Sequence, residues 1–241
     1  MENRVRTLLN TLLEVFYPSN CVGCGHPQDP GTLLCNECKE TAPRIRAPFC
    51  RCCSRPFAGF IYGEFSCPNC EDRTPAFDCV VSNYQAKGVL KELIHRFKYG
   101  HQFYLRRVLA EFLVEAMQDT RLQADPADYL VPVPLHPTRF RERGFNQADA
   151  LAETLSKRTR VPILRCIERR RYTNTQTRFD RFERMQNLRN AFVLRKNSDV
   201  RGKHLVLLDD VLTTGSTLHE CALVLRAAGA ESVRAITVAR G

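Results

Sequence analysis

The sequence predicts an α/β protein in which a parallel sheet is flanked by helices, with a small cysteine-rich domain on its N-terminal side. A run of Val and Leu at 204–208 is typical of a buried strand, and 217–228 repeats apolar residues at helical spacing. Similar strand-like and helical segments alternate from residue 78 onward, which favours a parallel sheet. Before residue 71, eight of the twelve cysteines form four Cys-x2-Cys pairs.

Length and composition set the first limits. A chain of 241 residues can hold one ordinary domain and a smaller attachment. Hydrophobic residues make up 44% and charged residues 26%, which is typical of a globular protein. No apolar run reaches the length of a membrane span, and the first residues lack the apolar core of a signal peptide, so a cytoplasmic location is expected. The amphipathic stretch 4–16 predicts a short helix that packs on the rest of the protein.

The formal net charge is +10, and its distribution is informative. Residues 1–75 carry as many acidic as basic side chains, so the whole excess lies in 76–241. A basic surface of this kind fits a partner that carries phosphates, either a nucleotide-like molecule or a nucleic acid. The cysteine-rich composition also stops near residue 75, which predicts domains at 1–75 and 76–241.

The cysteine pairs predict zinc binding, because a Cys-x2-Cys turn directs two thiolates at one tetrahedral ion and a second turn completes the site. The proposed ligands are Cys21, Cys24, Cys35, Cys38, Cys50, Cys53, Cys67 and Cys70. Two structural four-cysteine sites filled in sequence order are expected. An interleaved arrangement and a single occupied site are the open alternatives. Few apolar residues lie between the pairs, so metal is expected to supply the folding energy.

Four cysteines lie outside the pairs. Cys52 stands between two proposed ligands and is expected to take no part in zinc binding. Cys79, Cys166 and Cys221 occur in apolar segments and are expected to be buried as small hydrophobic residues.

The main domain is expected to contain about five strands that alternate with helices. The predicted strands are 78–84, 129–133, 161–168, 204–208 and 232–238. The predicted helices are 89–99, 103–117, 144–155 and 217–228.

An acidic pair follows the predicted strand 204–208, and a loop of small hydroxyl residues follows the pair. The residues are Asp209, Asp210, Thr213, Thr214, Gly215, Ser216 and Thr217. Open α/β sheets build ligand sites in this order, with the loop N–H groups and the next helix N-terminus holding a phosphate. The two carboxylates can hold vicinal ribose hydroxyls, directly or through Mg²⁺. A P-loop is excluded, because its Gly-x4-Gly-Lys-Ser/Thr pattern is missing.

A second polar cluster follows the predicted strand 129–133. Pro134, Leu135 and His136 form a short loop, and three arginines come directly after it. This arrangement could clamp a pyrophosphate, and Arg143 beside Gly144 is the strongest contact residue. Two roles stay open for His136, that of a catalytic acid and that of a turn residue.

Two further segments have alternative interpretations. Lys98 and Tyr99, at the end of a predicted helix, could face the ligand or cap the helix. The polar, arginine-rich stretch 169–190 could be a lid over the site or a solvated loop. Its expected contact residues are Gln176, Arg184 and Asn187.

Together these motifs resemble the ComF/GntX family of competence-associated, phosphoribosyltransferase-like proteins of bacteria. The resemblance covers almost the whole chain and rests on the cysteine pairs, the segments 132–134, 143–147 and 176–187, and Asp209–Asp210. It implies a type I phosphoribosyltransferase fold, with a double zinc ribbon, that binds phosphoribosyl pyrophosphate (PRPP) with Mg²⁺. By this resemblance the acidic pair contacts the ribose hydroxyls and the metal. Residues 213–217 would enclose the 5′-phosphate, and 134–136 would form the pyrophosphate loop.

The family is associated with uptake of single-stranded transforming DNA and with the use of DNA as a nutrient. The resemblance therefore implies single-stranded DNA, a competence helicase or a DNA-processing protein as partners, with a peripheral place at the uptake machinery. Two interpretations stay open. One is a phosphoribosyltransferase, a pentosyl-group glycosyltransferase, with an unidentified acceptor. The other is a non-catalytic module that senses PRPP and binds single-stranded DNA or a helicase.

Overall fold

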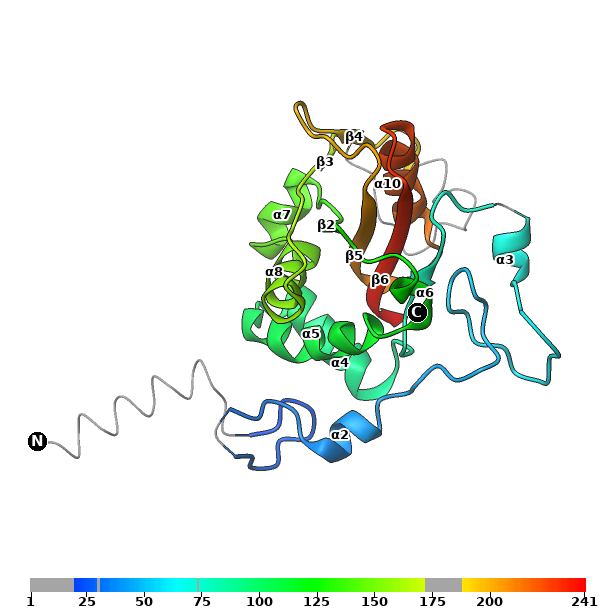
Figure 1. Cartoon of the computed structure of the whole chain (residues 1–241). Coiled ribbons are helices and arrows are strands. Elements are labelled where there is room, and N and C mark those ends of the chain that lie inside the picture. The colour runs from blue at the N-terminus through cyan, green and yellow to red at the C-terminus, as the bar shows by residue number, and fades with distance from the viewer. Residues whose placement is uncertain (1–19, 30, 73, 172–187) are drawn as a thin grey trace, which may run out of the picture.

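The centre of the protein is a parallel sheet of four strands in the order β1-β6-β5-β2, with helices on both faces (Figure 1). The computed structural model describes residues 20–29, 31–72, 74–171 and 188–241. The strands are β1 (Val80–Val81), β2 (Tyr129–Pro132), β5 (His204–Leu212) and β6 (Ser232–Arg240). The expected α/β class with a parallel sheet is therefore confirmed.

The two central strands carry most of the sheet. The apolar residues of 205–208 are fully buried between the helix layers, as a parallel strand requires. β5 pairs with β6 from His204 and Ser232 at one end to Leu212 and Arg240 at the other. β5 continues to Leu212, beyond the predicted end at residue 208, so the acidic pair lies within the strand and not after it.

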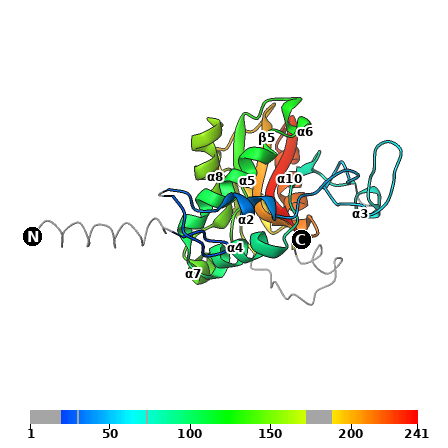
Figure 2. The ribbon, with the colours of Figure 1, turned by 90° about the horizontal axis from the view of Figure 1, so that it is seen from below.

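Helices cover both faces of this sheet (Figures 1 and 2). One face is covered by α4 (Gly88–Tyr99), α5 (Arg106–Ala116) and α8 (Gln147–Thr159), and the other by α10 (Ser216–Ala227). A 3-10 turn, η1 (Phe103–Leu105), leads into α5. All four helices were predicted from their apolar spacing, with boundaries that differ by a few residues.

One predicted strand is wrong. Of the segment 161–168, only Ile163 bridges β2, because Pro162 offers no N–H for a ladder. The chain then turns into β3 (Ile167–Arg169), which pairs antiparallel with β4 (Phe192–Leu194).

Other elements were not expected. No secondary structure was predicted for the arginine-rich residues after His136, but Pro137–Arg143 form the short helix α7. Proline at the first helical position is a helix-start signal that accounts for it. The short helix α6 (Thr120–Gln123) was also missed. The predicted N-terminal helix 4–16 lies outside the described residues.

The zinc-ribbon part lies along β1. It contains two short helices, α2 (Asn36–Glu40) and α3 (Pro68–Glu71), which lie well apart beside the main domain (Figure 2). Between them, the Val80 N–H donates to the Cys52 carbonyl at 2.7 Å, and the Ile45 N–H donates to the Asn83 carbonyl at 2.8 Å. These bonds cover the outer edge of β1, which would otherwise present unpaired backbone groups. They also explain why β1 spans two residues where 78–84 was predicted.

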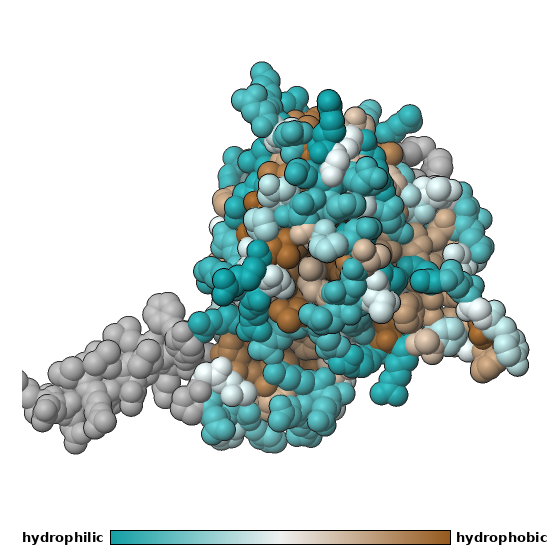
Figure 3. Space-filling model, in the orientation of Figure 1, coloured by the Kyte–Doolittle hydropathy of each residue, from teal (hydrophilic) through white to brown (hydrophobic). Residues whose placement is uncertain are grey.

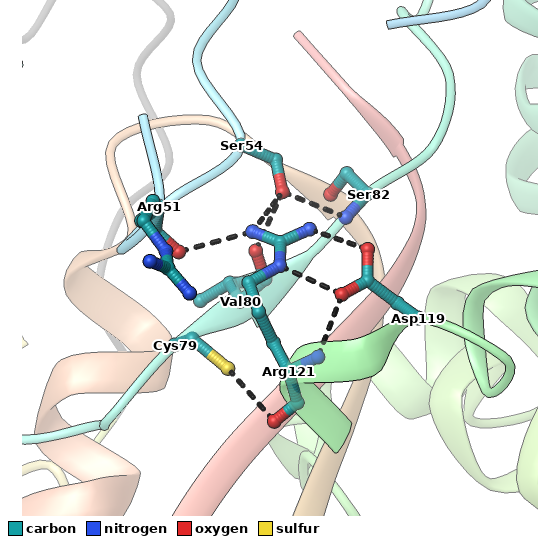
Figure 4. A network of polar contacts seen from close by, with 7 residues as sticks. All are labelled: Arg51, Ser54, Cys79, Val80, Ser82, Asp119 and Arg121. Carbon is teal, nitrogen blue, oxygen red and sulfur yellow. Dashed lines mark hydrogen bonds and ion pairs between the residues drawn. The ribbon is translucent and has the colours of Figure 1, made fainter. Parts of the chain in front are cut away.

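The side chain of Arg121 adds further hydrogen bonds at the outer edge of β1 (Figure 4). The Arg121 guanidinium donates two bonds of 2.8 Å to the carboxylate of Asp119. It also donates to the Arg51 carbonyl at 3.0 Å and to Ser54 Oγ at 3.2 Å. Ser54 Oγ in turn donates to the Val80 carbonyl at 2.7 Å. The predicted boundary at residue 75 is thus crossed by a hydrogen-bonded network.

Within the described ranges, no helix combines the length and the apolar character needed to cross a membrane.

The network predicts a large cost for Arg121→Ala. The side chain is 9% exposed, and its loss leaves the Asp119 carboxylate buried without its partner. We expect a loss of about 3 kcal/mol in the free energy of unfolding, measured by urea denaturation of the zinc-loaded protein. Burial opposes ionisation of Asp119, but Arg121 holds its pKa below the ordinary 3.8. The Arg121–Asp119 pair stabilises the folded protein at neutral pH. The difference in unfolding free energy between wild type and Arg121→Ala should therefore shrink as the pH falls below about 4.

Arg165→Ala is the matched control. Arg165 pairs with Asp149 and Glu153 on the surface, where its side chain is 44% exposed. Exposed pairs contribute little, so the expected loss is at most about 1 kcal/mol. Equal losses in the two variants would contradict the role given to Arg121.

Candidate functional site

The predicted ligand residues meet where the parallel strands end. β2, β5 and β6 are adjacent and point the same way, so the segments that follow them lie at one edge of the sheet. In Figure 2, α4, α7 and the end of β6 lie toward the same end of the molecule. This edge holds the acidic pair, the hydroxyl-rich loop and residues 134–136.

The acidic pair is the centre of the site. Successive side chains of a strand leave opposite faces of the sheet, so the two carboxylates start in opposite directions. Asp210 Oδ1 lies 2.9 Å from Lys98 Nζ at the end of α4. Asp209 accepts a hydrogen bond from the Asp210 N–H at 2.9 Å and interacts electrostatically with Arg169 and Cys221.

The electrostatics show too little positive charge around the pair. Burial and the neighbouring Asp210 carboxylate raise the pKa of Asp209 to about 7, although Lys98 and Arg169 oppose the shift. A further cation at this position would relieve the repulsion between the carboxylates. Carboxylate oxygens suit Mg²⁺, so these residues fit the metal predicted from the sequence.

The hydroxyl-rich loop leads directly into α10. Gly215 precedes the helix with a φ of +76°, a left-handed conformation that glycine adopts without strain. Thr214 Oγ1 lies 3.0 Å from Ser216 Oγ, which orders the turn. Gly215 has no side chain to cap this 12-residue helix, and the Ser216 N–H donates to Thr214 Oγ1 at 3.4 Å. The loop can therefore present backbone donors to an anion at the positive end of the helix dipole.

The segment 134–136 leaves β2 beside this loop. His136 caps α7, since its Nδ1 accepts a hydrogen bond from the Thr138 N–H at 3.2 Å. Partial burial and the positive charge of Arg169 and Arg141 lower the pKa of His136, so the ring is uncharged at neutral pH. With Nδ1 accepting, the ring proton is on Nε2, which makes it a donor. The turn role is therefore observed, and a catalytic role stays untested.

Arg143 is aimed across the site by two partners. Its Nη1 donates to Gln147 Oε1 at 2.9 Å, and its Nη2 donates to the Tyr99 hydroxyl at 3.2 Å. The buried Nε has no hydrogen-bond partner among the described residues. The guanidinium is thus held beside α8 and Tyr99, where its charge can act on an anionic ligand.

The residues that follow Arg143 explain why it is held there. Gly144 ends α7 in a left-handed conformation, with a φ of +79°. Phe145 packs on Phe97 and Phe103, with ring centroids 5.1 and 5.0 Å apart. Asn146 caps α8 and also donates to the Val133 carbonyl at 3.1 Å, which ties the helix to the end of β2.

The structure adds residues that the sequence did not single out as ligands. Lys98 faces the acidic pair, which resolves one of the two interpretations left open for it. Gln147 supports Arg143, and Arg169 reaches toward Asp209 from β3. In the sequence, a ligand-facing role is open for Lys98, Gln147 lies in the segment 143–147, and Arg169 lies in the arginine-rich stretch. The predicted contacts Gln176, Arg184 and Asn187 lie outside the described residues.

The eight paired cysteines form two clusters in sequence order. One contains Cys21, Cys24, Cys35 and Cys38, and the other contains Cys50, Cys53, Cys67 and Cys70, with all four ligand atoms of each within 4.8 Å of one another. Cys24 Sγ and Cys35 Sγ are 3.7 Å apart, and Cys53 Sγ and Cys67 Sγ are 3.6 Å apart. Tetrahedral Zn–S bonds of about 2.3 Å place sulfurs about 3.8 Å apart, so both clusters fit a structural zinc ion.

Hydrogen bonds favour one thiolate in each cluster, Cys21 and Cys50. Burial raises the pKa of Cys38, and the neighbouring Cys50 raises that of Cys53. Burial opposes ionisation of Cys21, but N–H groups that include that of Cys35, at 3.3 Å, lower its pKa to about 6. Hydrogen bonds from Cys53 and Cys70 lower the pKa of Cys50 far below its usual range. Thiolates are the form that binds zinc.

The remaining cysteines behave as expected. Cys79, Cys166 and Cys221 are buried, and burial raises the pKa of each thiol. Cys52 lies outside both four-sulfur clusters.

Two family models match separate parts of the chain. A model described as a double zinc ribbon domain matches residues 12–71, and one described as a phosphoribosyl transferase domain matches residues 142–241.

Curated relatives match most of the chain. Competence protein F of Haemophilus influenzae is 34% identical over 93% of this chain and 98% of its own. The DNA utilization protein YhgH of Escherichia coli K12 is 32% identical over 90% of this chain and 95% of its own. The competence protein ComFC of Bacillus subtilis is 31% identical over 88% of this chain and 85% of its own.

The clusters predict two zinc ions per chain, one of them lost in a Cys50→Ser/Cys53→Ser variant. Because the ligands group in sequence order, the first site should stay filled. Zinc content of the purified proteins, measured by mass spectrometry, checks this. Cys52→Ser is the control and should keep both ions. Loss of both ions from a variant in which Cys50, Cys53, Cys67 and Cys70 are all serine would instead support interleaved ligation, because each interleaved site would then lose two ligands.

Proposed function

The chain belongs to the ComF/GntX family, and from this premise we propose that it binds PRPP with Mg²⁺ and transfers its phosphoribosyl group. One observation carries the proposal. The carboxylate pair, the hydroxyl-rich loop before α10 and Arg143 lie at or beyond the carboxyl ends of neighbouring strands and so share one edge of the sheet. PRPP needs these features together, because it combines a ribose diol with phosphates at both ends.

Each part of the ligand has a proposed partner. Asp209 and Asp210 would hold the ribose hydroxyls and Mg²⁺, and Thr213, Thr214, Gly215, Ser216 and Thr217 would enclose the 5′-phosphate. Residues 134–136 and Arg143 would contact the pyrophosphate. Lys98 would move from Asp210 toward the leaving phosphates when the metal arrives, because the metal takes over its charge-balancing role.

The proposed reaction is a displacement at the anomeric carbon of the ribose. The bond from this carbon to the pyrophosphate oxygen breaks, a bond to the acceptor forms, and the acceptor loses a proton. Mg²⁺ would neutralise charge on the departing pyrophosphate. Arg143 and Nε2 of His136 would donate hydrogen bonds to the same oxygens. The stretch 169–190 is proposed as the lid that excludes water.

The relatives suggest the biological setting. Their names refer to competence and to DNA utilisation. We therefore propose a cytoplasmic protein that acts at the DNA-uptake machinery, on or beside single-stranded DNA and with a helicase or DNA-processing partner.

A second candidate function is a PRPP-sensing adaptor that binds single-stranded DNA. The observation that favours it is a pair of exposed aromatic rings on the long loop of the second ribbon. Phe60 is 81% exposed and Tyr62 is 92% exposed, with ring centroids 4.9 Å apart. In the space-filling view, apolar surface reaches the right-hand edge of the molecule over this loop (Figure 3). Exposed aromatic rings near basic side chains offer stacking positions for bases.

The proposed PRPP site predicts the behaviour of the double variant Asp209→Asn/Asp210→Asn. We expect calorimetric binding of PRPP with Mg²⁺ to weaken by at least roughly tenfold, because charge-assisted contacts to the diol and metal are lost. Pyrophosphate release is assayed in the same samples. Glu231→Gln, an exposed acid away from the site, is the control and should bind as the wild type does. Equal binding by both variants would remove the basis of the proposal.

The candidate function in DNA binding predicts the behaviour of the double variant Phe60→Ala/Tyr62→Ala. Base stacking is independent of salt, so single-stranded DNA affinity should fall by roughly tenfold with little change in its salt dependence. Fluorescence anisotropy of a labelled oligonucleotide at several salt concentrations measures both quantities. Leu223→Ala, a change at an apolar residue of α10 that is 45% exposed, should have no effect. Unchanged affinity in the aromatic variant would exclude this loop as the DNA contact.

A further inference from the structure

A cavity lies beside the hydroxyl-rich loop 213–217, called the phosphate loop from here on. It lies on the side of this loop away from residues 134–136. Its volume is about 440 Å³, within the range of small-molecule sites. Its lining comes from both parts of the chain. The second ribbon contributes Arg55, Pro56 and Asn69, and the main domain contributes Gln85, Lys87, Thr213, Thr214 and Arg240 among others.

The side chains that line this cavity carry positive charge only. Arg55, Lys87 and Arg240 contribute three cations, amides and hydroxyls supply further polar groups, and the carboxylate of Gly241 is the one acidic group in a lining without Asp or Glu. Arg55 and Lys87 are exposed, and neither forms an ion pair with a described residue. α4 begins at Gly88 without a side-chain cap, so its positive end adds to this field. The cavity is therefore suited to an anion.

Arg240 holds the wall of the cavity together. It is the last residue of β6, is 8% exposed, and donates from Nη1 to the Cys53 carbonyl at 2.9 Å. Cys53 belongs to the second four-cysteine cluster. Arg240 also accepts the Ala86 N–H on its backbone carbonyl. The zinc ribbon is thus fixed against the strand ends, so the cavity is a built feature of the fold.

The strand order shows where this cavity lies relative to the proposed pyrophosphate-binding residues. In the order β1-β6-β5-β2, residues 85–87 and Arg240 lie on one side of the phosphate loop, and residues 134–136 lie on the other. Displacement with inversion brings the nucleophile to the face of the sugar opposite the leaving group. If pyrophosphate leaves toward residues 134–136, the acceptor enters from the side of this cavity.

We propose that this cavity binds the acceptor, and that the acceptor is a small anion with a phosphate or carboxylate group held by Arg55 and Lys87. The placement of the acceptor rests on the proposed function; the anion site itself does not. The second zinc ribbon then forms one wall of the substrate site.

The test uses full-length, zinc-loaded protein with phenyl phosphate as the probe. The protein is first saturated with PRPP and Mg²⁺ so that the phosphate loop is filled, and phenyl phosphate is then titrated by calorimetry. Saturable binding is expected, and phenol, which lacks the phosphate, should bind at least roughly tenfold more weakly. Arg55→Ala and Lys87→Ala should each weaken phenyl phosphate binding by about fivefold and leave PRPP affinity unchanged. Lys196→Ala, an exposed lysine after β4, is the control.

The outcomes separate this proposal from the proposed function. Normal PRPP binding without phenyl phosphate binding, or phenyl phosphate binding that ignores Arg55 and Lys87, would overturn the acceptor site alone. A parallel loss of PRPP affinity in these variants would assign the cavity to PRPP and also overturn it. If wild-type protein binds no PRPP, the proposed function fails. Binding of phenyl phosphate that still depends on Arg55 would then support the anion site independently.

Discussion

Hydrogen bonds between residues 52–54 and 80–82 hold the zinc-binding segment on the edge of the main sheet. β1 contributes only two residues to the ladder, which is too little to stand as an isolated edge. The ribbon covers that edge with backbone and hydroxyl partners, and its own shape depends on metal because it has little apolar core. Metal binding, sheet integrity and the position of the ligand site are therefore linked through one line of contacts.

Charge balance shapes the ligand site in a similar way. Lys98 neutralises Asp210, while Asp209 keeps a raised pKa because burial and its neighbour act together. A site left short of positive charge is ready for a cation that arrives with its substrate. The positively charged cavity beyond the phosphate loop has the opposite imbalance. The edge of the sheet thus offers two adjoining regions of opposite sign.

The sequence predicts those parts of this arrangement that depend on neighbouring residues. The strand at 204–208, the loop and α10 follow from local apolar spacing and turn chemistry, and the cysteine clusters follow from ligand spacing. The position of Lys98 and Arg169 opposite the acidic pair depends on how α4 and β3 pack, which spacing does not encode. The fifth strand was wrong because Pro162 lacks an N–H for a ladder with β2, and Ile167–Arg169 pair with β4 instead. α7 was missed because arginines obscured the helix-start signal of Pro137.

The partner of β1 in the sheet is β6, the last strand of the chain. The two segments are separated by about 150 residues of intervening sequence, so their pairing is a contact of very high sequence separation. During synthesis, the ribbon cysteines and β1 leave the ribosome long before residues 232–240 do. Zinc can order the ribbon at that stage, but the strand it covers has no neighbour on its other side. The finished sheet edge, with Arg240 against Cys53, forms only after residues 232–240 have also left the ribosome.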